Sequence, residues 1–221
     1  MPYKSGTYGL SELTPVTEKL PLIQKDIDSS SPLFRDPKSV LPVIQPYSDA
    51  LDNRPIATKA LTSLVGWLLG DLIAQVFISE GPIDCMRLAT LCSFGFIFHG
   101  PSGHFFYGWL ESTIPGTDAF RVCSKVAFDQ IVWCPVFMSV FLMYLGLVNG
   151  DSFATIGNII KNELFTACLE SWKVWPLTHL IMFKFIPCKW RIPYVNAVQI
   201  AFNVILSLLG NKKLQMSGDN Y

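Results

Sequence analysis

Two carboxylates stand inside long apolar stretches of this chain, where an ionisable group is costly. Asp71 lies in GWLLGDLIAQ, four residues before Gln75, and Asp129 lies in KVAFDQIVWCP, directly before Gln130. A charge at the centre of a single membrane helix costs roughly 2.5–3.5 kcal/mol, whereas one hydrogen bond between membrane helices returns only about 0.6–2 kcal/mol. Each carboxylate therefore needs several partners, contact with water, or a proton.

Further polar side chains repeat at helical spacing along the same apolar stretches. Asn196, Gln199 and Asn203 follow one another at intervals of three and four residues. Such a polar seam suits either a water-filled path for solutes or a bundle held together by buried hydrogen bonds, and the sequence leaves both open. The candidate residues of this pore or polar core are Asp71, Gln75, His104, Asp129, Gln130 and His179. We expect Asp71 to face the interior, close to Asp129 and Gln130.

Catalysis is the rival chemistry for the stretch HGPSGH, residues 99–104. Its Gly-x-Ser-Gly pattern around Ser102 resembles the serine motif of rhomboid-type intramembrane proteases, with His179 on another helix as the base. This tetrapeptide is common by chance and the chain has no other rhomboid signature, so we disfavour proteolysis. We expect no catalytic residue, and the chain is expected not to be an enzyme.

Metal and cofactor sites have little support in the sequence. His99 and His104 are five residues apart, which does not place them on one helix face. The six cysteines lack CxxC spacing, and no glycine-rich phosphate loop is present. We expect no metal and no cofactor.

The composition places these residues in a membrane protein. Half of the 221 residues are hydrophobic and only 15% are charged, which is too apolar for an average soluble domain. Lys and Arg total 17, and Asp and Glu also total 17, so no net charge points to nucleic acid, and no nucleic acid contact is expected. The expected surroundings are a lipid bilayer and small solutes, with a homo-oligomer left open.

The expected fold is all-α, a polytopic membrane helical bundle with four clear spans. Three apolar segments, residues 57–78, 88–110 and 126–147, are as long as the roughly 20 residues that cross a bilayer, and a fourth span is placed near 164–186. The final apolar piece, 193–209, predicts a fifth C-terminal helix that either spans briefly or lies at the interface.

The chain divides into three parts around these spans. Residues 1–46 are expected to form a flexible tail, because the first 55 residues hold 8 of the 15 prolines and little apolar sequence. Residues 47–209 form the helical membrane domain, and 210–221 a polar C-terminal tail. Within the domain, Pro55 is suited to begin the first span after a short interfacial helix, and Gly66 with Gly70 forms a GxxxG pair for close helix packing.

Five motifs carry a resemblance over residues 47–209. They are PIATKALTSLVGWLLGDLIAQ, the pair Asp84 and Arg87, GPSGHFFYGWLESTIPG, KVAFDQIVWCP, and WKVWPLTHLIMFKFIPCKWR. In order and spacing they resemble the family of the twenty-two-kilodalton peroxisomal membrane protein and mitochondrial Mpv-seventeen. The family motif falls here on Gly70, Gly100, Pro101, Tyr107, Pro135, Trp175, Pro176, Pro187 and Arg191.

This resemblance implies a multi-pass protein of the mitochondrial inner or the peroxisomal membrane that acts as a weakly selective channel for small solutes. The alternative is a non-transporting component that maintains the organelle membrane. Four positions depart from the family pattern and bear on any shared solute preference. They are Phe106 for Trp, His179 for Gln, Met182 for Asn, and Phe202 for Trp.

Overall fold

A computed structural model describes residues 44–77 and 82–218, with side chains up to residue 204. Every regular element in these ranges is helical, so the prediction of an all-α fold is confirmed. The predicted flexible tail, residues 1–46, lies almost wholly outside the described residues. The first elements are the short helix α2 (Gln45–Asn53), expected from the sequence, and α3 (Pro55–Phe77), which begins at the proline suited to that place.

The second and third segments are long helices, each with one widened turn. Helix α4 (Cys85–Phe94) runs through the π-helical turn η4 (Gly95–His99) into α5 (Gly100–Thr113). Helix α6 (Ala119–Phe128) runs through a second π-helical turn, η5 (Asp129–Trp133), into α7 (Cys134–Val148). The chain closes with α8 (Phe153–Trp172), α9 (Trp175–Phe185), the 3₁₀ turn η6 (Cys188–Trp190) and α10 (Arg191–Gly218).

Prolines explain both widened turns. Pro101 and Pro135 are the second residues of α5 and α7, and each lies two residues after the end of a π-helical turn. A proline inside a helix lacks an N–H and collides with the carbonyl four residues earlier. The wider turn, in which the residue before each proline bonds five residues back, lets both helices continue past their proline.

Local signals set the helix starts as well. Asp84, Asp118 and Ser152 cap α4, α6 and α8, and their side chains accept hydrogen bonds from the backbone N–H three residues later at 2.9–3.2 Å. The turns before α6 and α8 contain Gly116 and Gly150 at positive φ, 112° and 79°, which few other residues adopt. The stretches IPGT, residues 114–117, and NGDS, residues 149–152, thus fall where helices end.

The predicted fourth span, 164–186, is wrong in its bounds. The chain breaks between α8 and α9 at residues 173–174, and Pro176 lies in the first turn of α9. The proline ring would meet the carbonyl of Trp172, so α8 ends there and a new helix starts. In the described residues, only Pro55–Phe77 and Ala119–Val148 are both long and apolar enough to cross a membrane by length and composition. The final helix, α10, is longer than the predicted piece 193–209.

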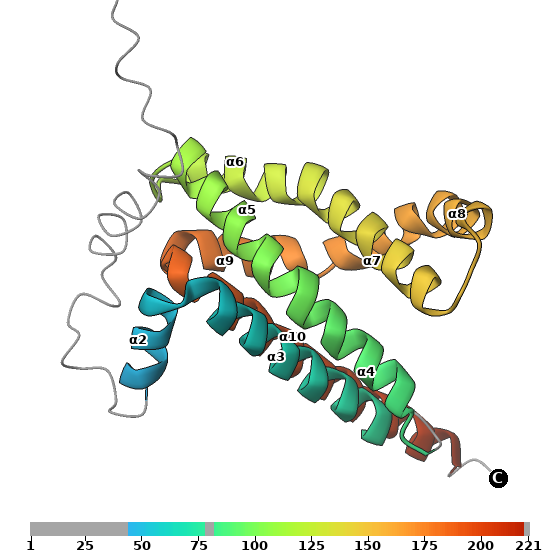
Figure 1. The fold of residues 1–221 in the computed structure, drawn as a ribbon. Coiled ribbons are helices and arrows are strands. Elements are labelled where there is room, and N and C mark those ends of the chain that lie inside the picture. Colours follow the sequence, from blue (N-terminus) through green and yellow to red (C-terminus); the bar gives the residue numbers. More distant parts are fainter. Residues whose placement is uncertain (1–43, 78–81, 219–221) are drawn as a thin grey trace, which may run out of the picture.

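Helix α3 packs against several other helices of the bundle (Figure 1). It runs side by side with α10 and also contacts α4, η4 and α5, while α7 packs on α8 and α6 on α9. The GxxxG prediction is confirmed, because Cβ atoms added at Gly66 and Gly70 would lie 2.2 Å and 2.7 Å from the side chains of Asn196 and Asn203 on α10. Only glycine permits this close approach.

The short helix α2 folds back against the start of α3. Leu51 is buried, and the Tyr47 hydroxyl lies 2.6 Å from that of Thr62. Burial raises the pKa of the Tyr47 phenol, with the hydrogen bond to Thr62 as a smaller opposing effect. Asp52 pairs with Lys189 of η6 at 3.0 Å. Helix α2 is therefore tied to the N-terminal part of α3 and to η6, which directly precedes α10.

Candidate functional site

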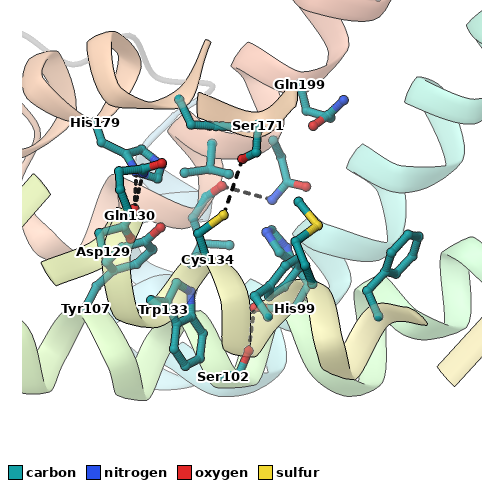
Figure 2. A pocket seen from close by; sticks show the side chains of 18 of the residues that line it. His99, Ser102, Tyr107, Asp129, Gln130, Trp133, Cys134, Ser171, His179 and Gln199 are labelled. Atoms are coloured by element: carbon teal, nitrogen blue, oxygen red, sulfur yellow. Dashed lines mark hydrogen bonds and ion pairs between the residues drawn. The ribbon is translucent and has the colours of Figure 1, made fainter. Parts of the chain in front are cut away.

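A cavity of about 160 Å³ lies among these helices. Side chains from α3, η4, α5, η5, α7, α8, α9 and α10 line it, so it lies between most of the bundle's elements. Figure 2 shows the labelled side chains converging from opposite sides, with His179, Gln130 and Asp129 together on one wall and His99 and Ser102 on another. The residues that line the cavity are far apart in the sequence, the first being Trp67 and the last Gln199.

One wall is a buried polar cluster, which we call the Asp129 cluster, formed by Asp129, Gln130 and His179. The Oδ2 atom of Asp129 lies 2.6 Å from Nδ1 of His179 and accepts a hydrogen bond from Nε2 of Gln130 at 2.5 Å. All three side chains are at least nine-tenths buried. The carboxylate thus finds two partners through a single oxygen atom.

The remaining polar atoms of the Asp129 cluster have no partner in the described part of the chain. They are Oδ1 of Asp129, Oε1 of Gln130 and Nε2 of His179. A buried polar group without a hydrogen bond costs about 1–3 kcal/mol, so an arrangement of three at one place is expensive. The three residues line the cavity, and these unpaired atoms lie buried in its wall.

The local fold explains how Asp129 and Gln130 come to share a wall. Consecutive residues of a regular α-helix point about 100° apart, yet both of these side chains are buried within the widened turn η5. His179 lies in the second turn of α9, which the break at residues 173–174 reorients relative to α8. The cluster therefore depends on two proline-induced irregularities.

Aromatic rings form much of the remaining wall. The Trp133 indole stacks on Phe106, with ring centroids 4.1 Å apart and planes 6° apart. Trp175 and Tyr107 contact the His179 imidazole from two directions, at centroid distances of 5.4 Å and 6.3 Å. These contacts hold the imidazole against the Asp129 side chain.

Helices α3, α5 and α10 are joined by a second set of polar contacts. The Ser63 hydroxyl lies 2.9 Å from Nδ1 of His99 and accepts a hydrogen bond from the Asn196 amide at 3.3 Å. The predicted residue His104 lies 3.0 Å from the ammonium nitrogen of Lys59. His104 does not line the cavity, whereas His99 and Asn196 do.

The expected contact of Asp71 with Asp129 and Gln130 is wrong. Asp71 pairs instead with Arg87 at 2.8 Å and accepts a hydrogen bond from Gln75 at 2.6 Å. The short connection between α3 and α4 places Arg87, in the first turn of α4, beside the last turns of α3. Asp71 and Gln75 are therefore held near the end of the first span and do not line the cavity.

A buried ion cluster was not predicted from the sequence. Glu111 of α5 accepts hydrogen bonds from Lys125 of α6 at 2.7 Å and from Arg191 of α10 at 2.5 Å, and all three side chains are at most 2% exposed. Arg191 is one of the family motif positions and Lys125 begins the motif KVAFDQIVWCP, but no pattern in the sequence links them to Glu111. A lone carboxylate in the apolar run YGWLE was the signal that could have revealed it.

The family motif positions have structural roles here. Gly70 and Gly100 lie where helices approach closely, and Pro101, Pro135 and Pro176 lie at the widened turns and the α8–α9 break. Pro187 precedes η6. Tyr107 and Trp175 line the cavity, and Arg191 belongs to the ion cluster.

The small polar side chains of the cavity wall have local partners. The hydroxyl of Ser102, the serine of the Gly-x-Ser-Gly pattern, donates to the carbonyl of His99 one turn earlier at 3.4 Å. The Cys134 thiol, also in the cavity wall, lies 3.6 Å from the Ser171 hydroxyl. In the described residues, no group of three His, Cys, Asp or Glu side chains is arranged to hold a metal ion. The cavity thus offers hydrogen-bonding groups and aromatic surface to a small molecule.

Comparison with known proteins gives a consistent set of relatives. A family model described as Mpv17 / PMP22 family matches residues 146–207. The chain is 33% identical to PXMP2/4 family protein 1 of Dictyostelium discoideum, over 75% of this chain and 83% of that protein. It is 31% identical to mitochondrial inner membrane protein Mpv17 of Rattus norvegicus (73% and 93%) and 28% identical to peroxisomal membrane protein 2 of Bos taurus (74% and 87%). No solved structure matches.

Proposed function

The chain belongs to the Mpv17 / PMP22 family of peroxisomal and mitochondrial membrane proteins, and from this premise we propose that it is a weakly selective channel for small solutes. Its surroundings are then an organelle bilayer, and its ligands are the solutes that pass. The observation that carries the proposal is the cavity between the helices with the Asp129 cluster in its wall.

The position of the cavity supports a solute path. Ionisable residues inside membrane helices that face a cavity commonly mark the route of an ion or solute, because only a wet or partnered site tolerates them. Irregular backbone at membrane depth is likewise tolerated where protein covers it or where it lines a water-filled space. The turn η5 and the end of η4 supply Asp129, Gln130 and His99 to this wall.

A second candidate function is a non-transporting component that maintains the organelle membrane. The contacts of Ser63 with His99 and Asn196 favour it, because they join α3 to two other helical elements and stabilise the bundle without any solute. The contact of Lys59 with His104 joins α3 to α5 in the same way. This candidate predicts that the protein leaves a bilayer tight.

We propose no enzymatic activity for the chain. The contact of Asp129 with Nδ1 leaves Nε2 of His179 as the atom that could act as a base, but within the described residues Nε2 has no hydrogen bond to Ser102. The hydroxyl of Ser102 points back to its own helix. A nucleophile and its base would need to be within about 3.2 Å of each other.

Solute flux into liposomes distinguishes the candidates. Purified protein is reconstituted, and the entry of neutral solutes of increasing size is followed by osmotic swelling. A channel passes small solutes up to a size limit, whereas a structural component leaves the vesicles as tight as protein-free ones. Tight vesicles with correctly folded protein would refute the proposed function.

A matched pair of variants links flux to the cavity. Ser171→Trp places an indole in the cavity wall and should reduce flux at least severalfold. Ala127→Trp adds the same indole to an exposed position on α6 and should leave flux unchanged. Equal flux in the two variants would mean that solutes take another route.

A further inference from the structure

We propose that the cavity binds a small organic ammonium ion, recognised by the Asp129 cluster and by the surrounding aromatic rings. The inference rests on the proposed function, since it names a class of solute that the same cavity takes. It is carried by four observations: the charge of the cavity wall, the unpaired acceptor atoms, the aromatic lining and the cavity volume.

The wall of the cavity carries a carboxylate and no fixed positive charge. Among the described residues that line it, Asp129 is the one acidic residue and none is Lys or Arg. The buried cations Lys125 and Arg191 are bound to Glu111, outside this wall. A cation entering the cavity therefore meets an acidic group without having to displace a resident one.

The unpaired atoms of the Asp129 cluster match an ammonium group. With the imidazole proton on Nδ1 donated to Asp129, the Nε2 atom of His179 is an acceptor. Oδ1 of Asp129 and Oε1 of Gln130 are acceptors as well, so in this tautomer three buried acceptor atoms of the cluster have no hydrogen bond within the described residues. A primary ammonium carries three N–H donors and no acceptor, which is the complementary set.

The aromatic rings around the Asp129 cluster also favour a positively charged ligand. Trp133, Trp175 and Tyr107 line the cavity, and the last two contact the His179 ring directly. A cation near the face of an indole or phenol ring is attracted by the ring quadrupole, and an anion is repelled. A carboxylate combined with aromatic walls is thus a site for an organic cation with an apolar body.

The volume limits the size of this ligand. An apolar cavity of about 150 Å³ in another protein holds one benzene molecule. The cavity here is of about the same volume, 160 Å³, so its occupant has about six non-hydrogen atoms. Alkylammonium ions with four or five carbon atoms fit this limit.

Three probes of similar size and different charge test the inference. Detergent-solubilised full-length protein is titrated calorimetrically with n-butylammonium chloride, 1-butanol or sodium butyrate, and heats from empty micelles are subtracted. Butylammonium should bind at least about tenfold more tightly than butanol, the factor that a charge-assisted hydrogen bond is worth, and butyrate should show no binding. Equal binding of the three probes, or a preference for butyrate, would overturn the inference.

Variants assign the binding to the cluster. Asp129→Asn keeps the side-chain shape and should weaken butylammonium binding at least about tenfold, while Gln130→Met removes one neutral acceptor and should weaken it about two- to tenfold. Asp71→Asn, which alters a buried carboxylate outside the cavity, should bind as the wild type does. Unchanged binding in folded Asp129→Asn would refute the assignment, and if that variant does not fold, the wild-type probe series and Gln130→Met decide.

The inference and the proposed function can fail separately. Glycerol entry into liposomes is measured on the same preparation as the titrations. Glycerol flux without a preference for butylammonium would reject the ammonium site and leave the channel standing. Tight vesicles together with binding that depends on Asp129 would reject the channel and leave the site as a binding pocket.

Discussion

Removing the negative charge of Glu111 should destabilise the bundle strongly. Glu111→Gln preserves the shape of the side chain but leaves Lys125 and Arg191 buried without a counter-charge, since both donate to the same carboxylate oxygen. All three side chains are at most 2% exposed, so water cannot compensate. Breaking a buried ion pair by removing one partner costs about 3–5 kcal/mol.

The remaining contacts of the two cations place the expected loss at the lower end of this range. Lys125 also donates to the carbonyl of Gly116 at 2.9 Å, and Arg191 donates to that of Ile186 at 3.4 Å and lies over the Phe183 ring at 5.0 Å. These contacts survive in the variant. We therefore expect a loss of about 3 kcal/mol in the free energy of unfolding.

Denaturant titration in mixed micelles, followed by circular dichroism, measures this loss. A double variant, Glu111→Gln with Lys125→Met, removes one of the stranded cations and should recover part of it. Asp118→Asn removes a carboxylate whose pair with Arg121 is half exposed, and should leave the unfolding midpoint unchanged. A loss below about 1 kcal/mol in Glu111→Gln would refute the view that this carboxylate neutralises the cluster.

Three further predictions follow from the packing and the cavity. Gly66→Ala should destabilise the protein by about 1–3 kcal/mol, because its Cβ would overlap a side chain of α10, whereas Gly157→Ala on an open helix surface should not; the unfolding titration compares the two. In single-channel recordings, Asp71→Asn should leave conductance and ion preference unchanged, whereas Asp129→Asn should alter them. The opposite pattern would show that Asp71, and not Asp129, lines the pore. Deletion of residues 1–43 should leave membrane insertion intact, as tested by alkaline extraction, because the segment has no apolar run.

The helices were largely predictable because their signals are local. Apolar length, Pro55 at the start of α3, and the capping residues Asp84 and Asp118 act within a few residues of themselves. The error at the fourth span has the same origin. Its apolar run continues through Trp175 and Pro176, and hydropathy alone joined two helices that the proline separates.

The candidate site was predictable in part. Asp129, Gln130 and His179 were singled out as polar groups in apolar sequence, and the structure brings these three together. The residues that complete the cavity, such as Trp133 and Ser171, gave no signal, because an aromatic or a serine in an apolar helix is ordinary. Their role depends on the space they enclose.

Taken by itself, the sequence determined that this is a helical membrane protein with polar groups at membrane depth. Apolar length and helical periodicity follow from the chain alone, and so does the direction in which each side chain leaves its own helix. Only the tertiary structure decided which polar groups meet: Asp71 with Arg87, Asp129 with His179, and Glu111 with Arg191. The members of the last two pairs are 50 and 80 residues apart, and their meeting depends on how the helices cross and rotate, which many small packing contacts set together.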